Sequence, residues 1–170
     1  MPPFESLLEE TLEAWQGTRQ GLIAEVRNIP AARFDFRPTP QSRSVTALVQ
    51  HILEIAMMMT GELTRADTNL HRAPWPKLLG HYAKPAWRAT TKPVLLRLLQ
   101  SQIKDGERRF RRAGELSLLQ LIKRFDGLPG TKLAWWNHGI AHEEYHRGQL
   151  ALYARLMNIE PALTRQIRGG

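Results

Sequence analysis

Apolar residues recur every three or four positions in four long stretches of the chain. Residues at this spacing share one face of an α-helix, so each stretch predicts an amphipathic helix with one side turned toward a core. The four predicted helices cover residues 4–27, 45–64, 91–113 and 132–158.

Polar residues and prolines mark where these helices begin and end. Ser44 and Thr131 precede the second and fourth helices, and both are predicted N-caps because their hydroxyls can accept a hydrogen bond from the first turn. Pro30 follows the first helix, and Pro161 blocks continuation of the last. Proline has this effect because it lacks the amide proton that a helix interior needs.

Three connecting segments lack a helical pattern. Residues 33–43 contain Pro38 and Pro40 and are predicted to be extended, whereas residues 118–125 suit either a short helix or an extended piece. Residues 67–93 are rich in proline and aromatic side chains and predict a long loop. Loops of this length are typically functional or partly ordered, and its aromatic part could cover a site.

Four amphipathic helices with little credible strand predict an all-α protein. An antiparallel four-helix bundle buries the four apolar faces together, with the long loop between helices 2 and 3. The chain has 170 residues, 42% of them hydrophobic and 24% charged, which is ordinary for one globular domain spanning residues 1–170.

The absence of cysteine excludes disulfides, thiolate metal sites and cysteine nucleophiles. The first residues lack the basic segment and apolar run of a secretory signal. No stretch approaches the roughly 18 apolar residues of a membrane-spanning helix. We therefore expect a cytoplasmic protein without a membrane partner.

The formal net charge is +8, which raises the question of an anionic partner such as nucleic acid. The densest basic run, residues 104–112, also contains Asp105 and Glu107, and no helix-turn-helix pattern accompanies it. A basic solvated surface explains the run more simply than nucleic-acid binding does. The charge could still steer an anionic small-molecule substrate toward the protein.

His142 and His146 are four residues apart in the last predicted helix, so both lie on one face and can share a metal ion. His51 lies on the inner face of the second helix and is the predicted third ligand. Three imidazoles with one open position are typical of catalytic zinc sites, and nickel also accepts nitrogen ligands. Each feature taken alone has a simpler explanation, since one histidine can be a core residue and a histidine pair can arise by chance.

Two motifs resemble a known family. The segments Ser44-Val45-Thr46-Ala47-Leu48-Val49-Gln50-His51-Ile52 and His142-Glu143-Glu144-Tyr145-His146-Arg147-Gly148-Gln149 are similar to the second and last helices of the DinB-like superfamily. This resemblance implies a four-helix bundle, usually dimeric, with a divalent metal site formed by His51, His142 and His146. Relatives include transferases and isomerases that use low-molecular-weight thiols, and many members have no assigned reaction.

Several functions remain open at this stage. The preferred hypothesis is a metal-dependent enzyme acting on a small molecule, of the thiol-dependent transferase or hydrolase type, in which the metal ion acts as a Lewis acid. Glu54 and either Glu143 or Glu144 could orient the imidazoles, and Tyr153 could contact substrate or simply pack. A metal-binding or stress-related bundle without turnover is the main alternative.

A sharper alternative comes from the segment 142–146, which matches the H-E-x-x-H motif of zincin proteases. In that interpretation Glu143 is the general base and the third ligand lies downstream. Only Glu160 offers an acidic ligand there, just past the helix end, and no strand is predicted to hold a peptide. A third ligand at His51 would exclude this hypothesis. His138, one turn before His142, is a reserve ligand.

Overall fold

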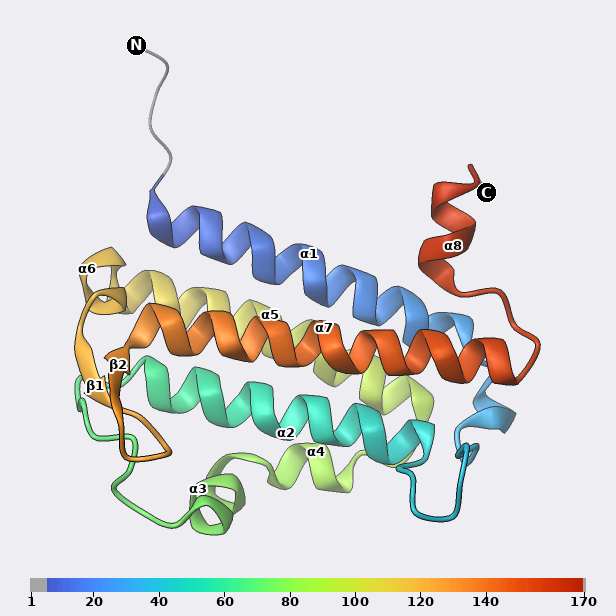
Figure 1. The fold of residues 1–170 in the computed structure, drawn as a ribbon, viewed down its shortest axis with the longest axis horizontal. Helices are drawn as coiled ribbons and strands as arrows, with labels where there is room; N and C mark the ends of the chain where they lie inside the picture. Colours follow the sequence, from blue (N-terminus) through green and yellow to red (C-terminus); the bar gives the residue numbers. More distant parts are fainter. Residues whose placement is uncertain (1–5, 170) are drawn as a thin grey trace.

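Four long helices, α1, α2, α5 and α7, lie side by side in the computed structural model, which describes residues 6–169 (Figure 1). The predicted all-α helical bundle is therefore confirmed. Residues 4 and 5 of the first predicted helix lie outside the described residues. The elements in chain order are α1 (Leu7–Asn28), the 3-10 helix η1 (Ala31–Arg33), α2 (Val45–Leu63), α3 (Trp75–Tyr82), α4 (Lys84–Arg88), α5 (Lys92–Ala113), α6 (Glu115–Leu118), β1 (Leu121–Lys123), β2 (Pro129–Thr131), α7 (Lys132–Leu156) and α8 (Ala162–Ile167).

Both predicted N-caps are confirmed. The Ser44 hydroxyl accepts a hydrogen bond from the amide of Ala47 at 3.2 Å, and the Thr131 hydroxyl accepts one from the amide of Ala134 at 3.1 Å. These bonds satisfy amides at the helix start that have no partner within the helix. They also fix where α2 and α7, the two helices with the candidate ligands, begin.

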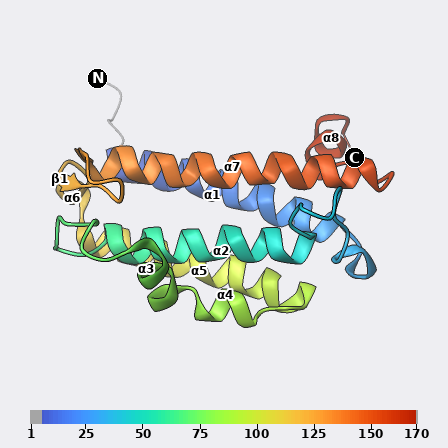
Figure 2. The same cartoon turned by 60° about the horizontal axis from the view of Figure 1, so that its bottom comes forward.

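The helix directions explain the long connection between α2 and α5. α2 and α7 are antiparallel, because Lys132 at the start of α7 donates to the carbonyl of Arg65 just past the end of α2, and Tyr153 near its end donates to the carbonyl of Arg43. α2 and α5 run in the same direction (Figure 1). Two parallel neighbours need a connection that returns along the bundle, and the segment with α3 and α4 provides it (Figure 2).

The prediction of a loop over residues 67–93 was wrong in its detail, because this segment contains α3 and α4. Pro76 and Pro85 of this proline-rich segment lie in the first turn of α3 and α4. Proline is well tolerated there, since the first amides of a helix have no partner within it.

The connection before α7 contains an extended piece, which was one of the two predicted alternatives. Residues 118–125 span the end of α6 and the short strand β1, which pairs with β2 in an antiparallel ribbon with Ile122 opposite Gly130. The structure also contains α8, which the apolar pattern did not predict and which begins directly after Pro161. Both elements are too short for a periodic pattern to reveal them.

The core has two apolar clusters at opposite ends of the bundle. One contains Leu22, Leu48, Leu95 and Leu150 among others, and the second includes Trp15, Met58, Phe110 and Trp136. His142 and His146 fall between the two groups along α7, whereas His51 lies among the α2 residues of the first cluster. Among the described residues, no helix is both long and apolar enough to cross a membrane.

Candidate metal centre

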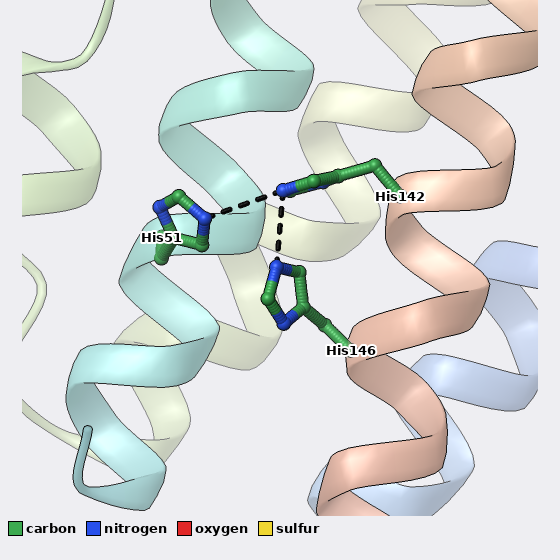
Figure 3. A group of neighbouring side chains, drawn as sticks. All are labelled: His51, His142 and His146. Atoms are coloured by element: carbon green, nitrogen blue, oxygen red, sulfur yellow. Dashed lines mark hydrogen bonds between the residues drawn. The ribbon is translucent and has the colours of Figure 1, made fainter. Parts of the chain in front are cut away.

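His51, His142 and His146 meet between α2 and α7 and point toward one another (Figure 3). The Nε2 atom of His142 lies 3.2 Å from Nε2 of His51 and 3.0 Å from Nε2 of His146. Two nitrogens that each lie about 2.0–2.1 Å from one metal ion, at an angle between about 90° and 110°, are about 2.8–3.4 Å apart. The spacing of these nitrogens therefore fits a shared divalent ion.

The protonation states also suit metal binding. Burial, together with the neighbouring His146 and His51, lowers the pKa of His142 from 6.5 to about 3. Burial likewise lowers the pKa of His146. Imidazole binds a metal in its neutral form, so burial keeps both rings ready to donate a lone pair at neutral pH.

Hydrogen bonds to the opposite ring nitrogens orient two of the three imidazoles. Nδ1 of His51 lies 2.7 Å from Oε1 of Glu54, and Nδ1 of His146 lies 2.7 Å from Oε1 of Gln149. Both oxygens accept hydrogen bonds, so each Nδ1 carries the proton and each Nε2 is free for a metal. The predicted orienting role of Glu54 agrees with this contact, and Gln149 adds a second such partner.

His142 differs from the other two histidines. Its Nδ1 atom is buried and has no hydrogen-bond partner within residues 6–169. Its ring is held by packing against the other two rings, with centroids 5.1 Å from His51 and 4.4 Å from His146. The three rings therefore have three different environments, although their Nε2 atoms converge.

Glu143 lies in a buried ion pair away from the histidine nitrogens. Its two carboxylate oxygens accept hydrogen bonds from Arg19 at 2.7 and 2.8 Å, and Oε1 also accepts one from the indole of Trp15 at 2.9 Å. The Arg19 and Glu143 side chains are only 1% and 3% exposed. A carboxylate fully engaged in this way is not placed to act as the general base that the zincin interpretation requires.

The remaining sequence candidates are engaged elsewhere. The Tyr153 hydroxyl donates to the carbonyl of Arg43 at 3.1 Å, and its buried ring packs edge-on against Phe36. Glu144 pairs with Arg147 on its own helix rather than with a histidine. His138 stacks on Trp135 and is exposed, so it is not one of the three converging ligands.

Sequence reasoning missed Arg19 and Gln102, which extend the buried polar contacts across the bundle. Arg19 also donates to the side chain of Gln102 at 2.6 Å, and Gln102 donates to the hydroxyl of Thr60 at 3.0 Å. A signal was available for Arg19, because it occupies a helical position between Trp15 and Leu22 in an otherwise apolar stripe. A charged residue at such a position implies a buried partner.

The fold and the site together define a helical bundle with a candidate three-histidine metal centre. A family model described as the DinB superfamily matches residues 14–150. The chain therefore belongs to the DinB superfamily, as the two motifs predicted.

Two solved structures share this fold. One is a DinB-like protein from Bacillus subtilis, with a TM-score of 0.66 and 20% sequence identity, covering 88% of this chain and 92% of that chain. The other is a protein assigned to the DinB family from Exiguobacterium sibiricum 255-15, with a TM-score of 0.66 and 18% identity, covering 91% of this chain and 95% of that chain. No curated protein matches the chain.

Proposed function

We propose that the protein is a metal-dependent enzyme that holds one divalent ion with His51, His142 and His146. The observation that carries the proposal is the convergence of three Nε2 atoms, with 3.2 Å and 3.0 Å between neighbouring atoms. Three imidazole ligands leave a coordination position open, which is the arrangement of catalytic rather than structural zinc sites. Zinc and nickel are the ions that this nitrogen donor set favours.

A bound divalent ion would supply Lewis-acid chemistry, lowering the pKa of water or of a substrate thiol to give a nucleophile near neutral pH. The chain's own residues prepare the centre for this role. Glu54 and Gln149 fix the rings of His51 and His146, and burial keeps His142 and His146 neutral. We therefore favour a thiol-dependent transferase or a hydrolase acting on a small molecule.

The family adds further parts of the proposal. Family membership favours a homodimer with a low-molecular-weight thiol as co-substrate. The absence of cysteine favours a cytoplasmic location. The alternative is a bundle of the same family that binds metal without turnover. The buried pairing of Glu143 with Arg19 weighs against a zincin-type protease.

Metal content is the first test of the proposal. Purified protein should carry about one divalent ion per chain by elemental analysis, and His51→Ala, His142→Ala and His146→Ala should each lose it while remaining folded by circular dichroism. His138→Ala is the matched control, because this exposed histidine lies on α7 one turn before His142. Retention of metal by His51→Ala, or its loss from His138→Ala, would overturn the proposed ligand set.

Turnover is the second test and separates the enzyme from the metal-binding alternative. The metal-loaded protein is assayed with a low-molecular-weight thiol and a chromogenic electrophile, and separately with ester and amide substrates. Activity that is lost with a chelator and restored by zinc or nickel supports the enzyme. Full metal loading without turnover in any of these assays favours a metal-binding protein.

A further inference from the structure

The short helix α4 exposes a tryptophan while it buries its small residues. Ala86 within α4 and its capping residues Ala83 and Ala89 are 0%, 0% and 1% exposed, whereas Trp87 is 45% exposed. Large aromatic side chains normally contribute by burying apolar surface, and this indole does so only in part. The position of Trp87 therefore needs an explanation other than core packing.

The indole N–H of Trp87 provides that explanation. It donates a hydrogen bond to Oε2 of Glu54 at 2.6 Å, while Oε1 of the same carboxylate accepts the Nδ1–H of His51 at 2.7 Å. Each oxygen of Glu54 thus holds one donor. A carboxylate fixed at both oxygens cannot rotate without breaking one of these bonds, so Trp87 restrains the group that orients His51.

The backbone around Trp87 is anchored to the same face of α2. The side-chain amide of Gln50 donates to the carbonyl of Ala89 at 2.9 Å and to the carbonyl of Trp87 at 3.3 Å. Gln50 directly precedes His51 in the sequence. Two side chains of α2, Gln50 and Glu54, therefore form hydrogen bonds with the segment that contains Trp87. The candidate ligand His51 lies between these two residues in the sequence.

Of the three candidate ligands, only His51 has a carboxylate partner among residues 6–169. His146 has the neutral amide of Gln149 from its own helix, and Nδ1 of His142 has no partner within residues 6–169. A carboxylate raises the basicity of the imidazole that it contacts more than an amide does. A change in Glu54 should therefore have a larger effect on metal affinity than a change in Gln149.

We propose that Trp87 is a positioning residue of the metal centre, acting through Glu54 to hold His51 with Nε2 facing the other two histidines. This inference rests on the proposed metal site. It assigns a role to the connection between α2 and α5, because α4 brings the indole to Glu54, the hydrogen-bond partner of the α2 ligand His51.

The test compares Trp87→Phe with Trp75→Phe. Trp75 is a suitable control because it lies in the same connection, is 40% exposed, and packs against Phe125 rather than against a histidine partner. Zinc affinity is measured by competition with a chromogenic chelator. Loss of a residue that orients a ligand typically weakens metal binding about 10–100-fold, so Trp87→Phe should weaken it about tenfold and Trp75→Phe should leave it unchanged.

A double variant shows whether Trp87 acts through Glu54. Glu54→Ala should weaken zinc binding at least as much as Trp87→Phe, and Glu54→Ala combined with Trp87→Phe should bind no more weakly than Glu54→Ala alone. Independent effects would instead multiply, because free energies of uncoupled sites add. Multiplied effects, or wild-type affinity in Trp87→Phe, would overturn the positioning role.

A readout without metal separates this inference from the proposed function. Nitrogen-15 NMR of the metal-free protein reports which ring nitrogen of His51 carries the proton. Wild type should show a proton at Nδ1, and Trp87→Phe should show a mixture of both tautomers. If wild type binds neither zinc nor nickel, the proposed function fails, and the tautomer measurement alone decides whether Trp87 positions His51. An unchanged tautomer in Trp87→Phe would overturn the role.

Discussion

Glu143 and Glu144 are adjacent on α7 but lie in opposite environments. The carboxylate of Glu143 is 3% exposed and pairs with Arg19, whereas that of Glu144 is 44% exposed and pairs with Arg147 near the surface. A buried guanidinium that loses its partner is left as an uncompensated charge in a poorly solvated site. An exposed ion pair contributes little, because water screens it.

We expect Glu143→Ala to destabilise the protein by about 3–5 kcal/mol and Glu144→Ala by less than about 1 kcal/mol. Urea unfolding of the two variants and wild type measures both free energies of unfolding. If Glu143 were instead a zincin general base, Glu143→Ala would abolish activity and leave the free energy of unfolding nearly unchanged. Equal stability of Glu143→Ala and wild type would contradict the buried ion pair as a structural element.

The sequence identified the candidate ligands but not the partners of Glu143. The histidine spacing on α7 follows from helix geometry alone, so His142 and His146 could be predicted as a pair. The contact between Arg19 and Glu143 joins residues 124 positions apart, and the choice of partner depends on how α1 and α7 pack. A charged residue in an apolar stripe indicates that its side chain is buried, but it does not identify the residue with which it pairs.

At the scale of elements, two glycines in long helices have different surroundings. A Cβ atom added to Gly106 of α5 would lie 2.4 Å from the Trp15 ring, so this glycine lets α1 and α5 approach closely. A Cβ atom added to Gly17 of α1 would meet nothing within 4 Å. Alanine is the better helix former at both positions, so packing alone distinguishes them.

Gly106→Ala should therefore lower the free energy of unfolding by roughly 1–3 kcal/mol, because overpacking outweighs the gain in helix propensity. Gly17→Ala should raise it by about 0.5–1 kcal/mol. Thermal or urea unfolding of the pair gives the comparison. A stabilised Gly106→Ala would mean that Trp15 moves aside at little cost.

The long helices were predictable because each carries many turns of the same apolar pattern. α3 and α4 were not, since they have 8 and 5 residues, too few for a convincing period, and prolines in their first turns resemble breaks. The path of the connection between α2 and α5 also depends on the parallel direction of these two helices. That direction is a property of the packed bundle and not of the segment's own sequence.

At the scale of the whole molecule, the basic run of α5 is partly neutralised by the fold. Arg108 and Arg109 both pair with Asp105, and Arg111 pairs with Glu9 of α1 and Glu107 of its own helix. The acidic residues inside the run were visible in the sequence, whereas the pair with Glu9 required the antiparallel packing of α1 and α5. The run therefore offers fewer free cations to an anionic polymer than its composition suggests.

The histidine cluster should also make the stability of the whole metal-free protein depend on pH. The pKa of His142 is about 3 in the folded protein and that of His146 is also lowered, whereas an unfolded histidine titrates near 6.5. As pH falls below 6.5, these two imidazoles bind protons in the unfolded chain but stay neutral in the folded one, so the free energy of unfolding falls.

Between pH 7.5 and pH 5.0, before most carboxylates titrate, the contribution of His142 should be roughly 1–2 kcal/mol. Urea unfolding at the two pH values in the presence of a chelator measures the loss, and His142→Gln, which cannot titrate, should show a smaller one. Zinc should steepen the dependence in wild type, because the metal binds only the neutral rings. An identical pH dependence in wild type and His142→Gln would show that this imidazole is not held neutral by burial, which would remove part of the physical case for a preformed metal centre.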